Sequence, residues 1–196
     1  ETVEIDLSKL EPEVAKAHPP DAVVPVRELK NLKVSQVCVG SCTNSSIQDM
    51  HTVAAILKGK KVHPDVSMTV NPGSKQVFNM MALDGTLATL IEAGARILES
   101  ACGPCIGMGQ VPPSGGVSVR TFNRNFQGRS GTKDAMVYLV SPATAAATAI
   151  KGVLTDPRTI RKQLRLRFPT KYQVAYSWIL QPYRKPETLE SKQGPN

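Results

Sequence analysis

The chain has 196 residues, of which 41% are hydrophobic and 20% charged, and it carries a formal net charge of +8. This length and composition are ordinary for one soluble domain with its own core, and they exclude a disordered or fibrous protein. No apolar run approaches the roughly 20 residues that a membrane-spanning helix needs, so we expect a soluble protein without a membrane partner.

Residues 1–33 form a leading segment. Pro19 and Pro20 cannot lie in the interior of a helix, so no helix is predicted across them. Strand and helix patterns then alternate through residues 34–155. Strands are predicted at 34–40, 66–70, 95–99, 117–121 and 136–140. Helices are predicted at 45–58, after residue 74 through residue 80, at 86–93 and at 142–150.

This alternation predicts an α/β domain of three layers, α/β/α, with a mostly parallel sheet and helices on both faces. Ligands bind beyond the carboxyl ends of the strands in such sheets. The pattern loosens in residues 156–196, which are interpreted as a C-terminal extension and linker. The chain is therefore divided into the leading segment, the domain at 34–155 and this extension.

Cysteine gives the strongest chemical signal. Cys42 stands in a predicted strand-to-helix turn, and Cys102 and Cys105 follow a later strand. The Cys-x-x-Cys pair alone is compatible with half a zinc site, a redox pair or half an iron–sulfur site. Such pairs favour a reducing compartment, which we expect to be the cytoplasm or, in a eukaryote, the mitochondrial matrix.

Two further observations bear on these alternatives. Zinc needs a fourth Cys or His nearby; the histidines are His18, His51 and His63, and neither His51 nor His63 is an obvious ligand. Cys38 lies in an apolar strand, where a buried cysteine usually serves as a small hydrophobic residue. If Cys38 were a fourth ligand, the cluster would be closed and the protein would resemble an electron carrier.

The loop after the fourth predicted strand combines Asn123, Arg124 and Arg129. Guanidinium groups bind carboxylates through two parallel hydrogen bonds, so this loop is typical of a polycarboxylate site. Near Cys42, the side chains of Ser41, Thr43 and Asn44 are candidates for hydrogen bonds to a cluster or a carboxylate, although Ser and Asn at a helix start often serve only as caps.

At these residues the chain resembles the aconitase superfamily of iron–sulfur hydro-lyases, which includes aconitase, homoaconitase and isopropylmalate isomerase. Three stretches carry the resemblance, namely 39–46, 101–107 and 122–129. The resemblance implies the fold of the third, cluster-bearing domain of aconitase. It also implies that the remaining domains or a small subunit of the same enzyme are partners.

By this resemblance, Cys42, Cys102 and Cys105 bind a [4Fe-4S] cluster whose fourth iron coordinates the substrate. Asn123 then lies near the cluster, and Arg124 and Arg129 hold substrate carboxylates. The Cys-Gly-Pro-Cys form is most similar to aconitate hydratase of the tricarboxylic acid cycle, which isomerises a tricarboxylic acid by dehydration and rehydration. Isopropylmalate and homoaconitate isomerases are the alternative, and the chain alone is expected to lack turnover.

Two other classes of function stay open. The basic stretch 158–167 suits RNA phosphates in an apo form of the protein, although only 5% of the residues are aromatic. An electron-transfer or redox module would use Cys38 as a fourth ligand or join Cys102 to Cys105 in a disulfide.

Overall fold

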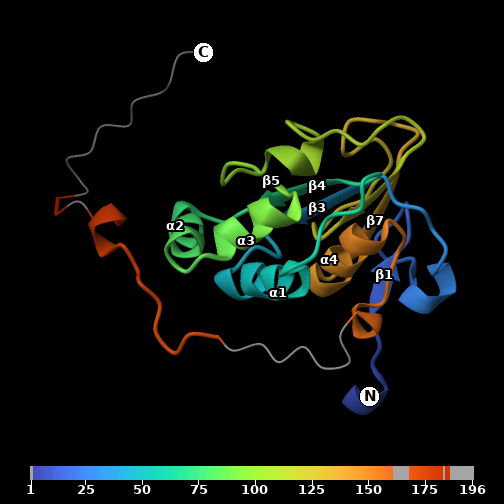
Figure 1. Ribbon diagram of the computed structural model, residues 1–196, viewed down its shortest axis with the longest axis horizontal. Helices are drawn as coiled ribbons and strands as arrows, with labels where there is room; N and C mark the ends of the chain where they lie inside the picture. Colours follow the sequence, from blue (N-terminus) through green and yellow to red (C-terminus); the bar gives the residue numbers. More distant parts are fainter. Residues whose placement is uncertain (1, 161–167, 183, 186–196) are drawn as a thin grey trace.

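The computed structural model describes residues 2–160, 168–182, 184 and 185. Its centre is a seven-stranded sheet in the order β2-β1-β7-β6-β3-β4-β5 (Figure 1). The strands are β1 (Glu13–Ala15), β2 (Val23–Pro25), β3 (Gln36–Gly40), β4 (Ser67–Asn71), β5 (Arg96–Ile97), β6 (Val117–Arg120) and β7 (Met136–Val140).

All pairings among β3, β4, β5, β6 and β7 are parallel, whereas β1 runs antiparallel to both β2 and β7. The α/β class and the mostly parallel sheet are confirmed. The chain builds β3, β4 and β5 in one direction and then returns to place β6 on the other side of β3. The strand order therefore reverses between the neighbouring strands β3 and β6.

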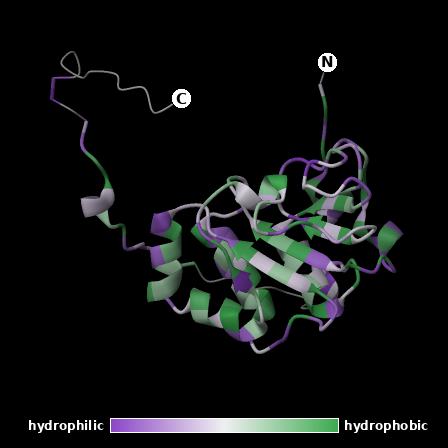
Figure 2. Cartoon of the chain, turned by 90° about the horizontal axis from the view of Figure 1, so that it is seen from above, coloured by the Kyte–Doolittle hydropathy of each residue, from purple (hydrophilic) through white to green (hydrophobic). Residues whose placement is uncertain are grey.

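Within the described residues, four α-helices follow the predicted pattern closely, and hydrophobic and hydrophilic residues alternate along the helical ribbons (Figure 2). Local capping sets their first turns. Ser46 and Asp49 form a reciprocal capping box, and Ser141 accepts a hydrogen bond from the backbone N–H of Thr144. The helices are α1 (Ile47–Leu57), α2 (Lys75–Leu83), α3 (Thr86–Ala93) and α4 (Pro142–Lys151).

One face of the sheet is apolar and is covered by these helices. Val37 and Val39 of β3 and Val119 of β6 are buried in one core with Met50 of α1 and Ala145 of α4. The alternation of side chains along a strand puts the residues between these valines on the opposite face.

That opposite face is polar, yet it is also buried. Gln36, Cys38, Thr69, Ser118 and Arg120 are all at most 1% exposed. The third layer that covers them consists of loops and the short 3-10 helix η3 (Gly103–Ile106) (Figure 1). This connection is rich in Gly and Pro, so it forms no α-helix where the sequence predicts a helical layer.

A described segment beyond the sheet contacts the helical layer. The backbone of Ala175 exchanges two hydrogen bonds with the side chain of Gln76 in α2, at 2.9 and 3.0 Å. No helix among the described residues is long and apolar enough to cross a membrane. Residues 161–167 of the predicted basic stretch lie outside the described residues, so RNA contact there stays a prediction.

Gly40, the last residue of β3, is expected to tolerate no side chain. Its φ is +119°, and an added Cβ would lie 1.9 Å from the carbonyl oxygen of Asn71. We expect Gly40→Ala to lower the free energy of unfolding by about 2–4 kcal/mol, measured by urea denaturation. Gly59→Ala is the matched control, because Gly59 also has a positive φ but a Cβ there meets nothing within 4 Å. An equal loss in both variants would contradict the steric argument.

Candidate functional site

The loops with the candidate residues meet at the carboxyl ends of β3, β4 and β6. The backbone N–H of Gly40 donates to Oγ1 of Thr121 at 2.9 Å, and the Asn44 amide donates to the Thr121 carbonyl at 2.5 Å. The N–H of Ser41 donates to the carbonyl of Asn71 at 3.3 Å. These bonds fix the turn that carries Cys42 against both neighbouring strands.

Ser41 joins the two cysteine loops. Its Oγ lies 2.6 Å from the backbone N of Cys42 and 3.1 Å from Sγ of Cys105, which comes from η3. Ser41 has a φ of 68°, a conformation that few residues other than glycine adopt. Unusual backbone of this kind is common at functional sites.

Of the three predicted ligands, Cys102 interacts with both of the others. Cys42 and Cys102 are exposed, whereas Cys105 is buried. Hydrogen bonds with Ser41 and Thr43 lower the pKa of the Cys42 thiol, and contact with Cys105 raises the pKa of the Cys102 thiol, with a further contribution from Cys42. Within the described residues, no group of three or more His, Cys, Asp or Glu side chains converges on a metal-ion site.

Cys38 lies beneath this group, in a small buried cluster with Cys105 and Phe122. Burial raises the pKa of the Cys38 thiol, and the positive charge of Arg120 opposes that shift only in part. A buried, protonated thiol is what the interpretation of Cys38 as a small hydrophobic residue predicts. Its role in a cluster stays a prediction.

The Asn123–Arg129 loop lies beside the cysteine turn. Asn123 and Arg124 are exposed, and Nε of Arg129 is buried without a hydrogen-bond partner in the described structure. A Cβ on Gly107 would lie 2.3 Å from the carbonyl oxygen of Ser130, so the end of this loop touches the turn just after Cys105. The structure thus brings the two predicted groups of residues together.

Sequence reasoning missed the part that His18 plays at this loop. Nδ1 of His18 lies 2.7 Å from the carbonyl oxygen of Asn125, and the Asn125 amide donates to the carbonyl of Lys16 at 2.6 Å. Because a carbonyl only accepts, Nδ1 of His18 carries the proton. His18 also has a positive φ, of 52°. No local pattern links two segments that are 107 residues apart.

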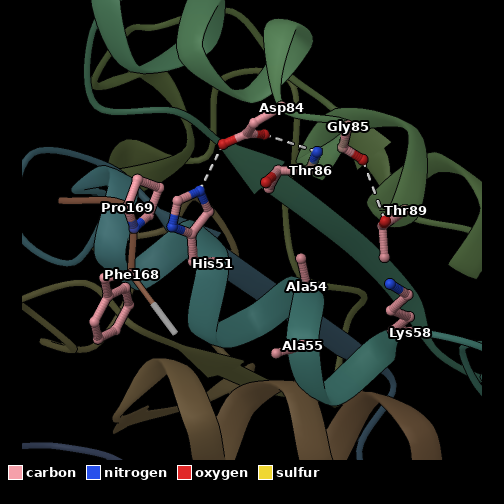
Figure 3. Close-up of a pocket in the computed structure, with 10 residues that line it drawn as sticks. All are labelled: His51, Ala54, Ala55, Lys58, Asp84, Gly85, Thr86, Thr89, Phe168 and Pro169. Atoms are coloured by element: carbon pink, nitrogen blue, oxygen red, sulfur yellow. Dashed lines mark hydrogen bonds and ion pairs between the residues drawn. The ribbon is translucent and has the colours of Figure 1, made fainter. Parts of the chain in front are cut away.

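A cavity of about 720 Å³ opens beside Cys102, and its apolar wall includes Leu98, Ile106 and Met108. A smaller cavity of about 350 Å³ lies on the helical layer, where His51 contacts Asp84 at 2.6 Å (Figure 3). The described residues that line this second cavity include no cysteine. The first cavity is the one that adjoins the interacting thiols.

Comparisons with a protein-family model and with known proteins agree on one family. The aconitase family (aconitate hydratase) matches residues 1–152. The 3-isopropylmalate dehydratase large subunit 1 of Methanopyrus kandleri is 50% identical over 156 residues, which are 79% of this chain and 37% of that protein. The homoaconitase large subunit of Thermus thermophilus is 48% identical over 163 residues, 82% of this chain and 39% of that protein. The chain therefore spans less than two-fifths of these relatives.

The four thiols of the metal-free chain are expected to differ in reactivity. At neutral pH, Cys42 should react with iodoacetamide at least about three times faster than Cys102. The lowered pKa of Cys42 leaves a larger fraction of this thiol as thiolate. The difference should shrink as the pH rises above both pKa values, and Cys38 should react only after denaturation because it is buried. Mass spectrometry of tryptic peptides measures each rate. Faster labelling of Cys102 than of Cys42 would refute this ordering.

Proposed function

The chain belongs to the aconitase family, and on that premise we propose that it is the cluster-bearing part of a hydro-lyase that removes water from a hydroxylated polycarboxylic acid and adds it back. The observation that carries the proposal is the approach of the Cys42 turn, the Cys105 loop and the Asn123–Arg129 loop at one edge of the sheet. Thiol ligands and guanidinium groups are the two parts that such a site needs.

The donor set fits an iron–sulfur cluster. Thiolates are the usual ligands of such clusters, and Cys102 interacts with both Cys42 and Cys105. When a [4Fe-4S] cluster is held by only three thiolates, its fourth iron supplies a Lewis acid with an open coordination position. The Cys105 thiol donates to Oγ of Ser41 at 3.1 Å, and this contact fixes the direction of the sulfur.

The chain's own residues would bind and orient the substrate. Arg124 presents its guanidinium at the surface, and the unpartnered Nε of Arg129 is a donor that a carboxylate oxygen can satisfy. Asn123 adds an exposed amide next to them. Asn125 instead has a structural task, since its buried side chain donates to the carbonyls of Lys16 and Val137.

For the substrate, we propose the class that the relatives' names describe, 3-isopropylmalate or homocitrate and its isomer. Identities of 50% and 48% to a 3-isopropylmalate dehydratase and a homoaconitase support this class over the citrate isomerisation that the Cys-Gly-Pro-Cys form favours. Both relatives are named large subunits, so we also propose that the chain works with a small subunit or with further domains.

Replacing single cysteines tests the ligand set. After anaerobic incubation with iron and sulfide, we expect Cys42→Ser, Cys102→Ser and Cys105→Ser each to lose most of the bound iron, because each removes one thiolate. Cys38→Ala is the matched control and should retain the iron of the parent chain. Iron and sulfide analysis measures the outcome, with EPR after mild oxidation to detect loss of a single iron. Loss in Cys38→Ala with retention in Cys42→Ser would overturn the assignment.

Substrate specificity can be tested by binding and turnover together. We expect 3-isopropylmalate or homocitrate to change the EPR spectrum of the reduced, cluster-loaded chain at lower concentration than citrate does. We expect the chain alone to form no unsaturated acid in the steady state. The ultraviolet absorbance of that acid measures its formation. Arg129→Met should abolish the spectral change while the iron content stays the same. A response to citrate alone would favour the aconitate hydratase type instead.

A further inference from the structure

Arg120 is the largest side chain that the described part of the protein buries completely. Its guanidinium donates to Oγ of Ser118 at 2.9 Å, to Oε1 of Gln36 at 2.9 Å, and to the carbonyls of Pro104 at 2.5 Å and Gln110 at 3.1 Å. All of these acceptors are neutral. None of the ion pairs among the described residues involves Arg120.

These hydrogen bonds link two layers of the protein. Ser118 and Gln36 belong to the polar face of the sheet, whereas Pro104 and Gln110 lie on either side of Cys105 in the covering loop. The guanidinium therefore holds the cysteine loop at two points. Its planar array of donors allows this, because one side chain can reach several acceptors in fixed directions.

The charge itself has no counter-ion in the described structure. A buried cation is costly unless an anion compensates it, and neutral acceptors do so only in part. Pro104, whose carbonyl accepts from the guanidinium, stands between Cys102 and Cys105, so thiolates at these two positions would bring negative charge near Arg120. Net charge and nearby hydrogen bonds are what set the reduction potential of an iron–sulfur cluster.

We propose that Arg120 is the buried counter-charge of the bound cluster and the positioning residue of Cys105. This inference rests on the proposed function for the presence of the cluster. The positioning role acts on the metal-free chain as well, since every hydrogen bond that supports it is formed by protein atoms alone.

The counter-charge is tested by potentiometry on the reconstituted chain. Arg120→Met should make the midpoint potential of the cluster more negative, because reduction adds negative charge that the guanidinium stabilises. Arg120→Lys keeps the charge and should stay close to the parent. Arg96→Met is the control: Arg96 is exposed and donates to the carbonyl of Gly109 in the same loop, so its charge is screened by water and the potential should move less than in Arg120→Met.

The positioning role is tested on the metal-free chain. Both Arg120 variants should increase the alkylation rate of buried Cys105 by about tenfold, because the loop loses charge-assisted hydrogen bonds and opens more often. Arg96→Met removes an exposed hydrogen bond from the same loop and should raise that rate by less than either Arg120 variant does. Circular dichroism tests whether each variant is folded. If Arg120→Met is unfolded, Arg120→Lys decides the positioning role.

The two measurements separate the possible failures. A parent chain that never binds a cluster contradicts the proposed function and the counter-charge, while the alkylation rates still decide the positioning role. A folded, fully loaded Arg120→Met chain with the parental potential overturns the counter-charge. Parental alkylation of Cys105 in both folded variants overturns the positioning role.

Discussion

A hydrogen bond of 2.9 Å from Gly40 to Thr121 joins two residues that are 81 positions apart in the chain. It lies at the carboxyl end of the pairing between β3 and β6, where the strand order reverses. The cysteine turn leaves one of these strands and the arginine loop leaves the other, so this pairing sets the distance between metal ligands and carboxylate-binding groups. Parallel strands bring such loops together because all of them end at the same edge.

The same pairing creates a sheet with two different faces. Valines of β3 and β6 face the helices, and their neighbours Gln36, Cys38, Ser118 and Arg120 face the loop layer. A buried polar face is stable only where its groups are satisfied, and here the covering loop supplies carbonyl acceptors to Arg120. The loop with Cys102 and Cys105 is thus held by directed hydrogen bonds, which restrict its position more closely than apolar packing would.

Local patterns predicted most of the sheet and the helices. The predicted helix at 86–93 coincides with α3, since Gly94 ends it, and the five parallel strands were all found from their apolar runs. Strands β1 and β2 were missed because three residues give no measurable alternation. The candidate cysteines and arginines were found from their motifs, but His18 and Arg120 act through partners distant in the sequence, which no local pattern reports.

The exposure of the site bears on how the proposed enzyme is assembled. Cys42 and Cys102 are exposed, and beside them Ile106 and Met108 are 46% and 65% exposed. Apolar side chains that surround a reactive site usually mark a surface that another part of the protein covers. An iron with an open position needs such cover, because oxidants reach it otherwise. On the proposed function, the site is therefore completed by a surface that closes over the thiols and the Asn123–Arg129 loop, and Lewis acid and substrate carboxylates meet at that junction.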